Sequence, residues 1–254
     1  MKAEFAGKTA LVTGASRGIG SATALALAKE GTSRVVIHYN GYREGAEETA
    51  AAVRKSGAQV EILGGDLSTD EGIQGFLSEL KSKAPEVDIL INNAGHLIMR
   101  AKLLEFTPEV FDQVMNLNAK SAYFIAQAVV PGMIKKGAGI IINVSSIAAR
   151  NGGGPGATVY AAAKSAVATI TKGLAKELAP HGIRVNAVSP GTVDNYFHEK
   201  HSNRQILDAV VQMTPAGRLG TNEEVADTIV FLCSEGSRYT YGQTIEINGG
   251  MYMV

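Results

Sequence analysis

The stretch Thr13-Gly14-Ala15-Ser16-Arg17-Gly18-Ile19-Gly20 decides the fold. It follows an apolar, β-branched run at residues 9–13 and precedes residues 21–29, whose apolar side chains recur at helical spacing. The sequence therefore predicts a strand, a glycine turn and a helix in direct succession. Glycines let a backbone approach a pyrophosphate closely, and the free N–H groups of a helix N-terminus attract its negative charge. This turn predicts a dinucleotide-binding site.

The rest of the chain repeats the alternation of strand and helix. Further strands are predicted at residues 34–39, 58–63, 87–92, 139–144, 183–188 and 243–247. Further helices are predicted at residues 111–134, 159–178 and 223–232. Strands that are apolar on both faces and alternate with helices are typical of a parallel sheet covered on both sides. We predict a single-domain, doubly wound (Rossmann) α/β fold over residues 1–254, with a seven-stranded parallel sheet.

Charge and composition exclude several classes of protein. Lys+Arg and Asp+Glu number 24 each, so the formal net charge is zero. No net positive charge is therefore available to attract nucleic acid or an anionic membrane. No apolar run reaches the roughly 20 residues that span a bilayer, and residues 1–4 are expected to lead straight into a strand without a signal-peptide core. We expect a cytoplasmic protein.

The single cysteine, Cys233, lies in an apolar helical stretch and is predicted to be buried. No residues have the spacing of a metal site.

Two motifs connect the chain with a known family. The glycine turn has the pattern TGxxxGxG, and Asn92-Asn93-Ala94-Gly95 follows the fourth predicted strand. With these motifs the chain resembles the short-chain dehydrogenase/reductase family essentially from end to end. Ser189-Pro190-Gly191 resembles the family's PG motif, which embraces the nicotinamide carboxamide. The resemblance implies these cofactor-binding residues: Gly14, Ser16, Arg17, Gly18, Ile19, Gly20, Asp66, Leu67, Asn93, Ala94, Gly95, Pro190, Gly191 and Val193. Asn195 departs from the threonine that relatives often have at this position, but it can still donate and accept hydrogen bonds and is expected to contact the carboxamide.

The choice of cofactor depends on the end of the second strand. A site for NAD places an acid there on the ribose 2′-hydroxyl, whereas this chain has Tyr39 followed by Asn40. Arg17 and Arg43 lie close enough in sequence to the site to reach a 2′-phosphate, which arginine binds in bidentate fashion. We expect NADP(H) to be preferred over NAD(H). If both arginines are instead ordinary surface charges, the preference is weak or dual.

Tyr160 and Lys164 are expected to share one helix face. They are four residues apart, about one helical turn. A phenol with an ordinary pKa of about 10 is a poor base at neutral pH, and a nearby cation that favours the phenolate lets it exchange a proton with a substrate oxygen. The resemblance makes Tyr160 the general acid/base of hydride transfer, and it places both residues beside the cofactor.

The resemblance adds a serine and an asparagine to the catalytic set. Ser146 matches the family's serine, which orients the carbonyl oxygen and stabilises its developing charge, and Ser145 is the alternative. Asn118 matches the asparagine that holds a water between the lysine and solvent, and Asn116 is the alternative. The interval from Ser146 to Tyr160 is one residue longer than in many relatives, which affects the shape of the pocket.

The substrate is indicated only by a few polar residues. The predicted substrate loop spans about residues 192–215 and is more polar than a steroid or long acyl pocket requires. His198 lies in this loop, and His96 and Arg150 are at positions that commonly border the substrate in the family. Together they favour a small anionic substrate, such as a keto sugar acid of the uronate type. A nearly equal alternative is a 3-oxoacyl-[acyl-carrier-protein] reductase, which the chain resembles from the glycine turn to Asn248-Gly249-Gly250. A non-catalytic cofactor-binding protein is a remote third reading, because the four catalytic residue types are intact.

Apolar surface predicts self-association. Residues 111–134 and 159–178 have more apolar side chains than one buried face requires, and the chain ends in Met251-Tyr252-Met253-Val254. Relatives usually form tetramers through the corresponding helices and through the last strand. We therefore expect a homotetramer. The alternative is that the tail covers its own core.

Overall fold

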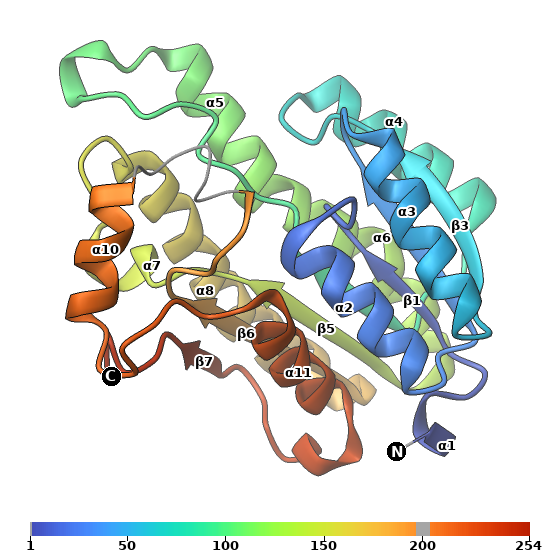
Figure 1. The fold of residues 1–254 in the computed structure, drawn as a ribbon. Coiled ribbons are helices and arrows are strands. Elements are labelled where there is room, and N and C mark those ends of the chain that lie inside the picture. Colours follow the sequence, from blue (N-terminus) through green and yellow to red (C-terminus); the bar gives the residue numbers. More distant parts are fainter. Residues whose placement is uncertain (1, 197–203) are drawn as a thin grey trace.

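The molecule is built on one seven-stranded parallel sheet (Figure 1). The computed structural model describes residues 2–196 and 204–254. Within them the strands lie in the order β3-β2-β1-β4-β5-β6-β7. This confirms the predicted doubly wound fold. The strands are β1 (Thr9–Val12), β2 (Arg34–Tyr39), β3 (Gln59–Gly64), β4 (Ile89–Asn92), β5 (Gly139–Val144), β6 (Ile183–Pro190) and β7 (Thr244–Ile247).

Helices cover both faces of the sheet. One layer consists of α2 (Gly18–Lys29), α3 (Arg43–Lys55) and α11 (Asn222–Cys233). The other consists of α4 (Asp70–Lys83), α6 (Ser121–Lys136) and α8 (Thr158–Leu178). Shorter helices are α1 (Lys2–Phe5), α5 (Pro108–Met115), α7 (Ala148–Asn151) and α10 (Arg204–Met213). No helix in the described ranges is long and apolar enough to cross a membrane.

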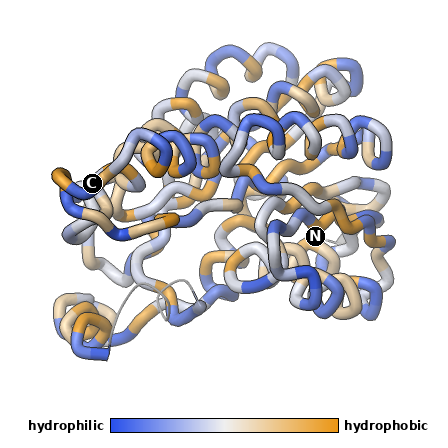
Figure 2. The backbone as a smooth tube through the Cα atoms, turned by 90° about the horizontal axis from the view of Figure 1, so that it is seen from above, coloured by the Kyte–Doolittle hydropathy of each residue, from blue (hydrophilic) through white to orange (hydrophobic). Residues whose placement is uncertain are grey.

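Alternate residues of the strands pack into opposite layers. Ala10 and Val12 of β1 belong to the core beneath α2, α3 and α11, whereas Leu11 belongs to the core beneath α4, α6 and α8. All three are completely buried. In Figure 2 the central strands are accordingly hydrophobic, while the outer helices alternate between hydrophobic and hydrophilic turns. Burial on both faces explains why the strands read as continuous apolar runs.

Two predictions about local structure were wrong. The chain does not run straight into β1, because residues 2–5 form the short helix α1 and Phe5 is fully buried. Residues 111–134 do not form one regular helix either. A π-helical turn, η2 (Asn116–Lys120), separates α5 from α6. Such turns often occur at functional sites because they redirect side chains, and this one contains Asn118. The prediction for Cys233 was right: it is buried, which raises the pKa of its thiol to about 12.

The order of the strands creates a crevice at their carboxyl ends. The chain passes from β1 to β2 and β3 on one side, and then crosses back to β4 on the other side of β1. Loops that follow β1 and β4 therefore leave the sheet in different directions. Ligands of doubly wound sheets bind at this kind of topological switch point.

Gly20 tests how closely the first turn of α2 packs. A Cβ on Gly20 would collide with the carbonyl oxygen of Gly14 and lie 2.5 Å from Nδ2 of Asn93. We expect Gly20→Ala to lower the free energy of unfolding in urea by about 1–3 kcal/mol through overpacking. The matched control is Gly75→Ala in exposed α4, where a Cβ meets nothing within 4 Å. There we expect about 0.5–1 kcal/mol of added stability. Equal stabilities for the two variants would contradict the close approach.

Candidate active site

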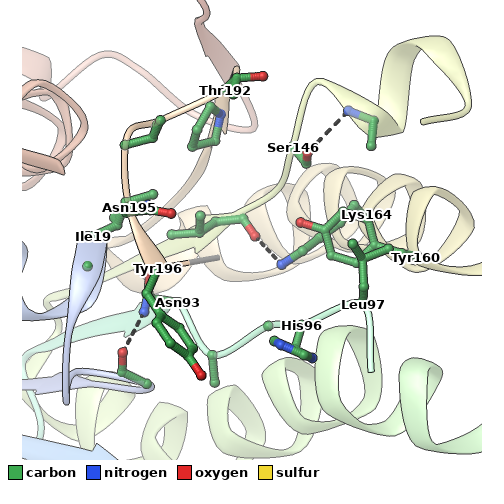
Figure 3. A pocket seen from close by; sticks show the side chains of 18 of the residues that line it. Ile19, Asn93, His96, Leu97, Ser146, Tyr160, Lys164, Thr192, Asn195 and Tyr196 are labelled. Carbon is green, nitrogen blue, oxygen red and sulfur yellow. Dashed lines mark hydrogen bonds between the residues drawn. The ribbon is translucent and has the colours of Figure 1, made fainter. Parts of the chain in front are cut away.

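A cavity of about 870 Å³ lies at the carboxyl ends of the strands. Figure 3 shows Ser146, Tyr160 and Lys164 on one side of it, and Asn195 and Tyr196 on the other. It brings together segments from the beginning, the middle and the last quarter of the chain. The sequence-predicted residues that line it are Gly14, Ser16, Arg17, Gly18, Ile19, Asn40, Leu67, Asn93, Ala94, Gly95, His96, Ser146, Tyr160, Lys164, Pro190, Gly191, Val193 and Asn195.

The glycine turn suits the pyrophosphate of a dinucleotide. Gly14 and Gly18 have φ of +64° and +62°, which L side chains rarely adopt. Arg17 stands at the N-cap of α2 but provides no side-chain cap, and the first turn of α2 contains no acid. The N-terminal N–H groups and the positive end of the helix dipole therefore face the cavity without a competing carboxylate. The residues present fit a dinucleotide cofactor.

Asn93 and Thr13 join the glycine turn to the loop after β4. The Asn93 side-chain amide donates to the carbonyl oxygens of Thr13 and Gly14 at 2.8 and 3.1 Å. In return, the Thr13 hydroxyl accepts from the backbone N–H groups of Asn93 and Ala94, both at 2.9 Å. Asn92 extends the connection behind the cavity, because it donates to the Asn143 side chain on β5 at 2.9 Å. These bonds hold two segments that line the cavity at a fixed separation.

His38 is a cavity residue for which the sequence analysis proposed no role. Its Nδ1 accepts from the backbone N–H of Gly14 at 3.1 Å, and its Nε2 bonds the carbonyl oxygen of Gly65 at 3.0 Å. The ring packs edge-on against Phe76. Burial lowers the pKa of His38 to about 4, so the imidazole is neutral at physiological pH and can accept the Gly14 bond. A histidine inside an otherwise apolar strand was the available signal.

Four of the proposed cofactor residues lie outside the cavity lining. Gly20 packs under the turn. Tyr39 is turned to the opposite face of β2 from His38 and packs against the core beneath α2 and α3. Arg43 is exposed and pairs with Glu47 at 3.8 Å. Asp66 is exposed and accepts from the backbone and hydroxyl of Ser68. Their roles toward the cofactor remain predictions.

Tyr160, Ser146 and Lys164 meet at the inner end of the cavity. Tyr160 and Lys164 project from α8, and Lys164 Nζ lies 5.7 Å from the centroid of the Tyr160 ring. The Lys164 ammonium donates to the carbonyl oxygen of Val144 at 2.8 Å. Ser146 forms a side-chain hydrogen bond with Tyr160. Ser145, the alternative serine, is buried and donates instead to the carbonyl oxygen of Lys164 at 2.9 Å. This geometry favours Ser146.

Burial shifts the pKa values of Tyr160 and Lys164. It raises the pKa of Tyr160 to about 12, although the hydrogen bond with Ser146 acts in the opposite direction. Burial also lowers the pKa of Lys164 to about 8. Both shifts have the same cause, because desolvation disfavours the charged form of each group. The phenol is therefore protonated at neutral pH and can act as an acid.

Asn118 lies behind the cavity wall and binds the loop after β4. Its Oδ1 accepts from the backbone N–H of His96 at 3.1 Å. Its amide donates to the carbonyl oxygens of His96 and Val114 at 2.8 and 2.9 Å. A Cβ on Gly95 would lie 2.7 Å from both Asn118 Oδ1 and Lys164 Nζ, so these groups converge on one glycine. Asn116, the alternative, points elsewhere and donates to the carbonyl oxygen of Ser68.

Of the predicted substrate residues that the structure describes, one lines the cavity and one does not. His96 lines the cavity, and its Nδ1 accepts from the backbone N–H of Ile98 at 2.8 Å. Arg150 does not line it, because its guanidinium pairs with Glu246 on β7 at 2.8 Å. His198 lies outside the described residues. Arg100, which the sequence analysis did not single out, lines the cavity and donates to the carbonyl oxygen of Pro155 at 3.0 Å. Nothing in the local sequence separated Arg100 from Arg150.

Comparisons with known proteins identify the family of this chain. The family model described as "Enoyl-(Acyl carrier protein) reductase", of the short-chain dehydrogenase/reductase type, matches residues 14–252. The 3-oxoacyl-[acyl-carrier-protein] reductase of Pseudomonas aeruginosa is 40% identical over 251 residues, which cover 97% of this chain and 98% of that protein. The chain belongs to the short-chain dehydrogenase/reductase family. It is an oxidoreductase that acts on CH–OH and C=O groups and uses a nicotinamide cofactor.

Solved structures of similar proteins differ in their substrates. The structure of DEH reductase A1-R′, a mutant, has a TM-score of 0.88 and 32% identity, with 100% of both chains covered. A gluconate 5-dehydrogenase from Burkholderia cenocepacia, in complex with NADP and tartrate, has a TM-score of 0.86 and 33% identity, with 97% of this chain and 95% of that chain covered. These similarities agree on the class of reaction but not on the substrate. The substrate therefore has to be inferred from the residues that line the cavity.

His38 makes folding stability depend on pH. Its pKa is about 4 in the folded state and 6.5 in the unfolded state, so only the unfolded state gains a proton as pH falls from 7 to 5. By linkage, protonation of His38 in the unfolded state should lower the free energy of unfolding by about 2 kcal/mol between pH 7 and pH 5. We expect the loss in free energy of unfolding between pH 7 and pH 5 to be smaller by this amount in His38→Asn. Equal losses in the wild type and the variant, measured by urea titration, would contradict a neutral buried imidazole.

Proposed function

We propose that this protein reduces the carbonyl group of a small oxo acid or keto sugar of the uronate type, with NADPH as hydride donor. One observation supports it above all. The protonated phenol of Tyr160, with its partner Ser146, stands in the same cavity as His96 and Arg100. A proton donor for the reacting oxygen and two groups suited to an anion thus surround one space.

The residues of the chain provide a route for the proton. The bound nicotinamide supplies or accepts the hydride at carbon. Tyr160 donates its phenolic proton to the substrate oxygen as negative charge develops there. Ser146 provides a hydrogen bond to the same oxygen, which is most effective in a site with little water. Burial lowers the pKa of Lys164 to about 8, and this residue lies one helical turn from Tyr160. Lys164 can therefore return a proton to the Tyr160 oxygen after the transfer.

Preference for NADP(H) is supported by Arg17. It lines the cavity at the glycine turn, and the adjoining residues His38, Asn40 and Tyr42 are uncharged or neutral rather than acidic. An arginine there attracts a 2′-phosphate, and the described residues that line the cavity include no carboxylate that would repel it. The similar gluconate 5-dehydrogenase was solved with NADP. Arg43, the other arginine of the sequence prediction, is exposed beside Glu47.

The leading alternative is a 3-oxoacyl-[acyl-carrier-protein] reductase. It is favoured by curated relatives of that name, which are 37–40% identical to this chain. A long acyl chain would need an apolar extension of the cavity, and Leu97, Ile206 and Met251 supply some apolar lining. The polar groups of His96, Arg100 and Asn151 at the same cavity favour the oxo acid.

A substrate panel distinguishes these readings. We expect NADPH oxidation to be faster with keto sugar acids than with 3-oxoacyl thioesters or uncharged diketones. Tyr160→Phe should lower kcat by about 100-fold or more, since it removes the general acid, while NADPH still binds. Arg100→Gln should raise KM for oxo acids and leave KM for diketones unchanged. Preference for thioesters, with no effect of Arg100→Gln, would move the protein to the acyl reductases.

We also propose that the protein is a homotetramer. The outer edge of β7 is unpaired by any described strand, because β7 ends the sheet. Phe231 of α11 is 52% exposed, and Tyr123 and Ile134 of α6 are 41% and 40% exposed. Met253 and Val254 are also exposed at 77% and 83%, so the end of the tail does not cover its own core. Exposed edges and apolar side chains of this kind are usually covered in natural proteins.

Light scattering after size-exclusion chromatography measures the oligomeric state. We expect a mass four times that of the 26.6 kDa chain. A lysine at Phe231 should dissociate the assembly at least to dimers, because it places a charge in an apolar contact. A wild-type protein that elutes as a monomer at micromolar concentration would contradict the proposal.

A further inference from the structure

The guanidinium of Arg17 lies between two tyrosine rings. Its Cζ is 4.1 Å from the centroid of the Tyr42 ring and 3.9 Å from that of the Tyr196 ring. All three side chains line the cofactor cavity. Both distances are well within the roughly 6 Å over which an arginine is attracted to an aromatic face. One cation of the glycine turn is thus held by aromatic residues from two other parts of the chain.

Tyr42 is placed by the beginning of α3. It is the N-cap residue of that helix, and its ring lies against the Cα of Gly45 one turn further on. A Cβ on Gly45 would collide with this ring and with the backbone oxygen of Ser16 in the glycine turn. The contact therefore needs glycine at position 45. It brings the aromatic ring directly beside the segment that contains Arg17.

Tyr196 is placed by the segment that follows β6. Val193 forms a parallel bridge with Gly220, and the backbone N–H of Asp194 donates to the carbonyl oxygen of Gly220 at 2.9 Å. The Asn195 amide then donates to the side chain of Asn222, at the start of α11, at 3.0 Å. Three consecutive residues before Tyr196 are therefore tied to the region around α11, which packs on α2.

We propose that Tyr42 and Tyr196 form an aromatic clamp on Arg17 that determines the preference for NADP(H). This inference rests on the proposed use of NADP(H). The two ring contacts at 4.1 and 3.9 Å restrict where the guanidinium can lie. Its N–H donors are the part that binds a phosphate in bidentate fashion, and aromatic rings do not compete for them as a carboxylate would. A side chain that is already held loses less conformational freedom on binding. Neither tyrosine adds a charge that would repel the 2′-phosphate.

The clamp also connects the two ends of the cavity. Tyr196 belongs to the segment predicted to border the substrate, whereas Arg17 belongs to the cofactor turn. In Figure 3 Tyr196 lies across the pocket from Tyr160 and Lys164 and close to Asn93. Discrimination between the two cofactors is therefore assigned in part to a residue that is about 180 positions away from the glycine turn in sequence.

Binding of cofactor without substrate tests the clamp. The fluorescence of NADPH and of NADH reports each dissociation constant on the full-length protein. We expect Tyr196→Leu and Tyr42→Leu each to weaken NADPH binding by about five- to tenfold, the size of one cation–π contact. NADH binding should change less than about twofold, because NADH has no 2′-phosphate. Tyr196→Phe keeps the ring and should bind NADPH as the wild type does. Tyr239→Leu, at a tyrosine that is 97% exposed, is the matched control.

A double-mutant cycle makes the result specific to Arg17. In an Arg17→Ala background, Tyr196→Leu should no longer change the ratio of the two dissociation constants. Equal weakening of NADPH and NADH by Tyr196→Leu would overturn the clamp, and so would tighter binding, which would mean that the ring occupies space the cofactor needs. If the wild type itself binds both cofactors equally, the proposed NADP(H) preference fails instead. If the wild type prefers NADPH and Tyr196→Leu keeps that preference, only the clamp fails.

Discussion

The close approach between the glycine turn and the loop after β4 is the constraint on which the rest of the site depends. Glycine at positions 14 and 20 removes the side chains that would keep the two segments apart, and the Asn93 amide then bridges them. Because β1 and β4 are neighbours in the sheet, this contact also fixes the floor of the crevice. His38 supports the turn from the side of β2, and it can do so only while its imidazole is neutral.

Burial governs the chemistry at the other side of the cavity. Tyr160 and Lys164 share a helix face, but their spacing alone does not say which of them is charged. Desolvation raises the pKa of the phenol and lowers that of the ammonium, so the pair is less ionised than the same residues would be on a surface. Asn118 contributes by holding the backbone of His96, which allows Gly95 to lie against Lys164 without a side chain between them.

Specificity arises from loops that the common framework brings to one cavity. Relatives with different named substrates share the sheet and cover nearly the whole chain, so the framework does not select the substrate. Arg100 and Arg150 illustrate the point. Both are arginines near the catalytic residues in sequence or in space, yet Glu246 of β7 binds Arg150, while Arg100 lines the cavity. Tyr196 likewise comes from a loop, and its ring contacts Arg17 of the glycine turn.

The sequence by itself determined the sheet, the glycine turn and the lysine one turn after Tyr160, because apolar periodicity and glycine spacing are local properties that the fold has to respect. The tertiary structure alone decided which polar residues share the cavity. Three contacts join segments that are far apart in the chain. His38 accepts from the backbone of Gly14, an ion pair with Glu246 holds Arg150 away from the cavity, and the Tyr196 ring contacts Arg17. No local pattern contains such a contact, since a side chain's partner and its burial exist only after the strands and loops have packed.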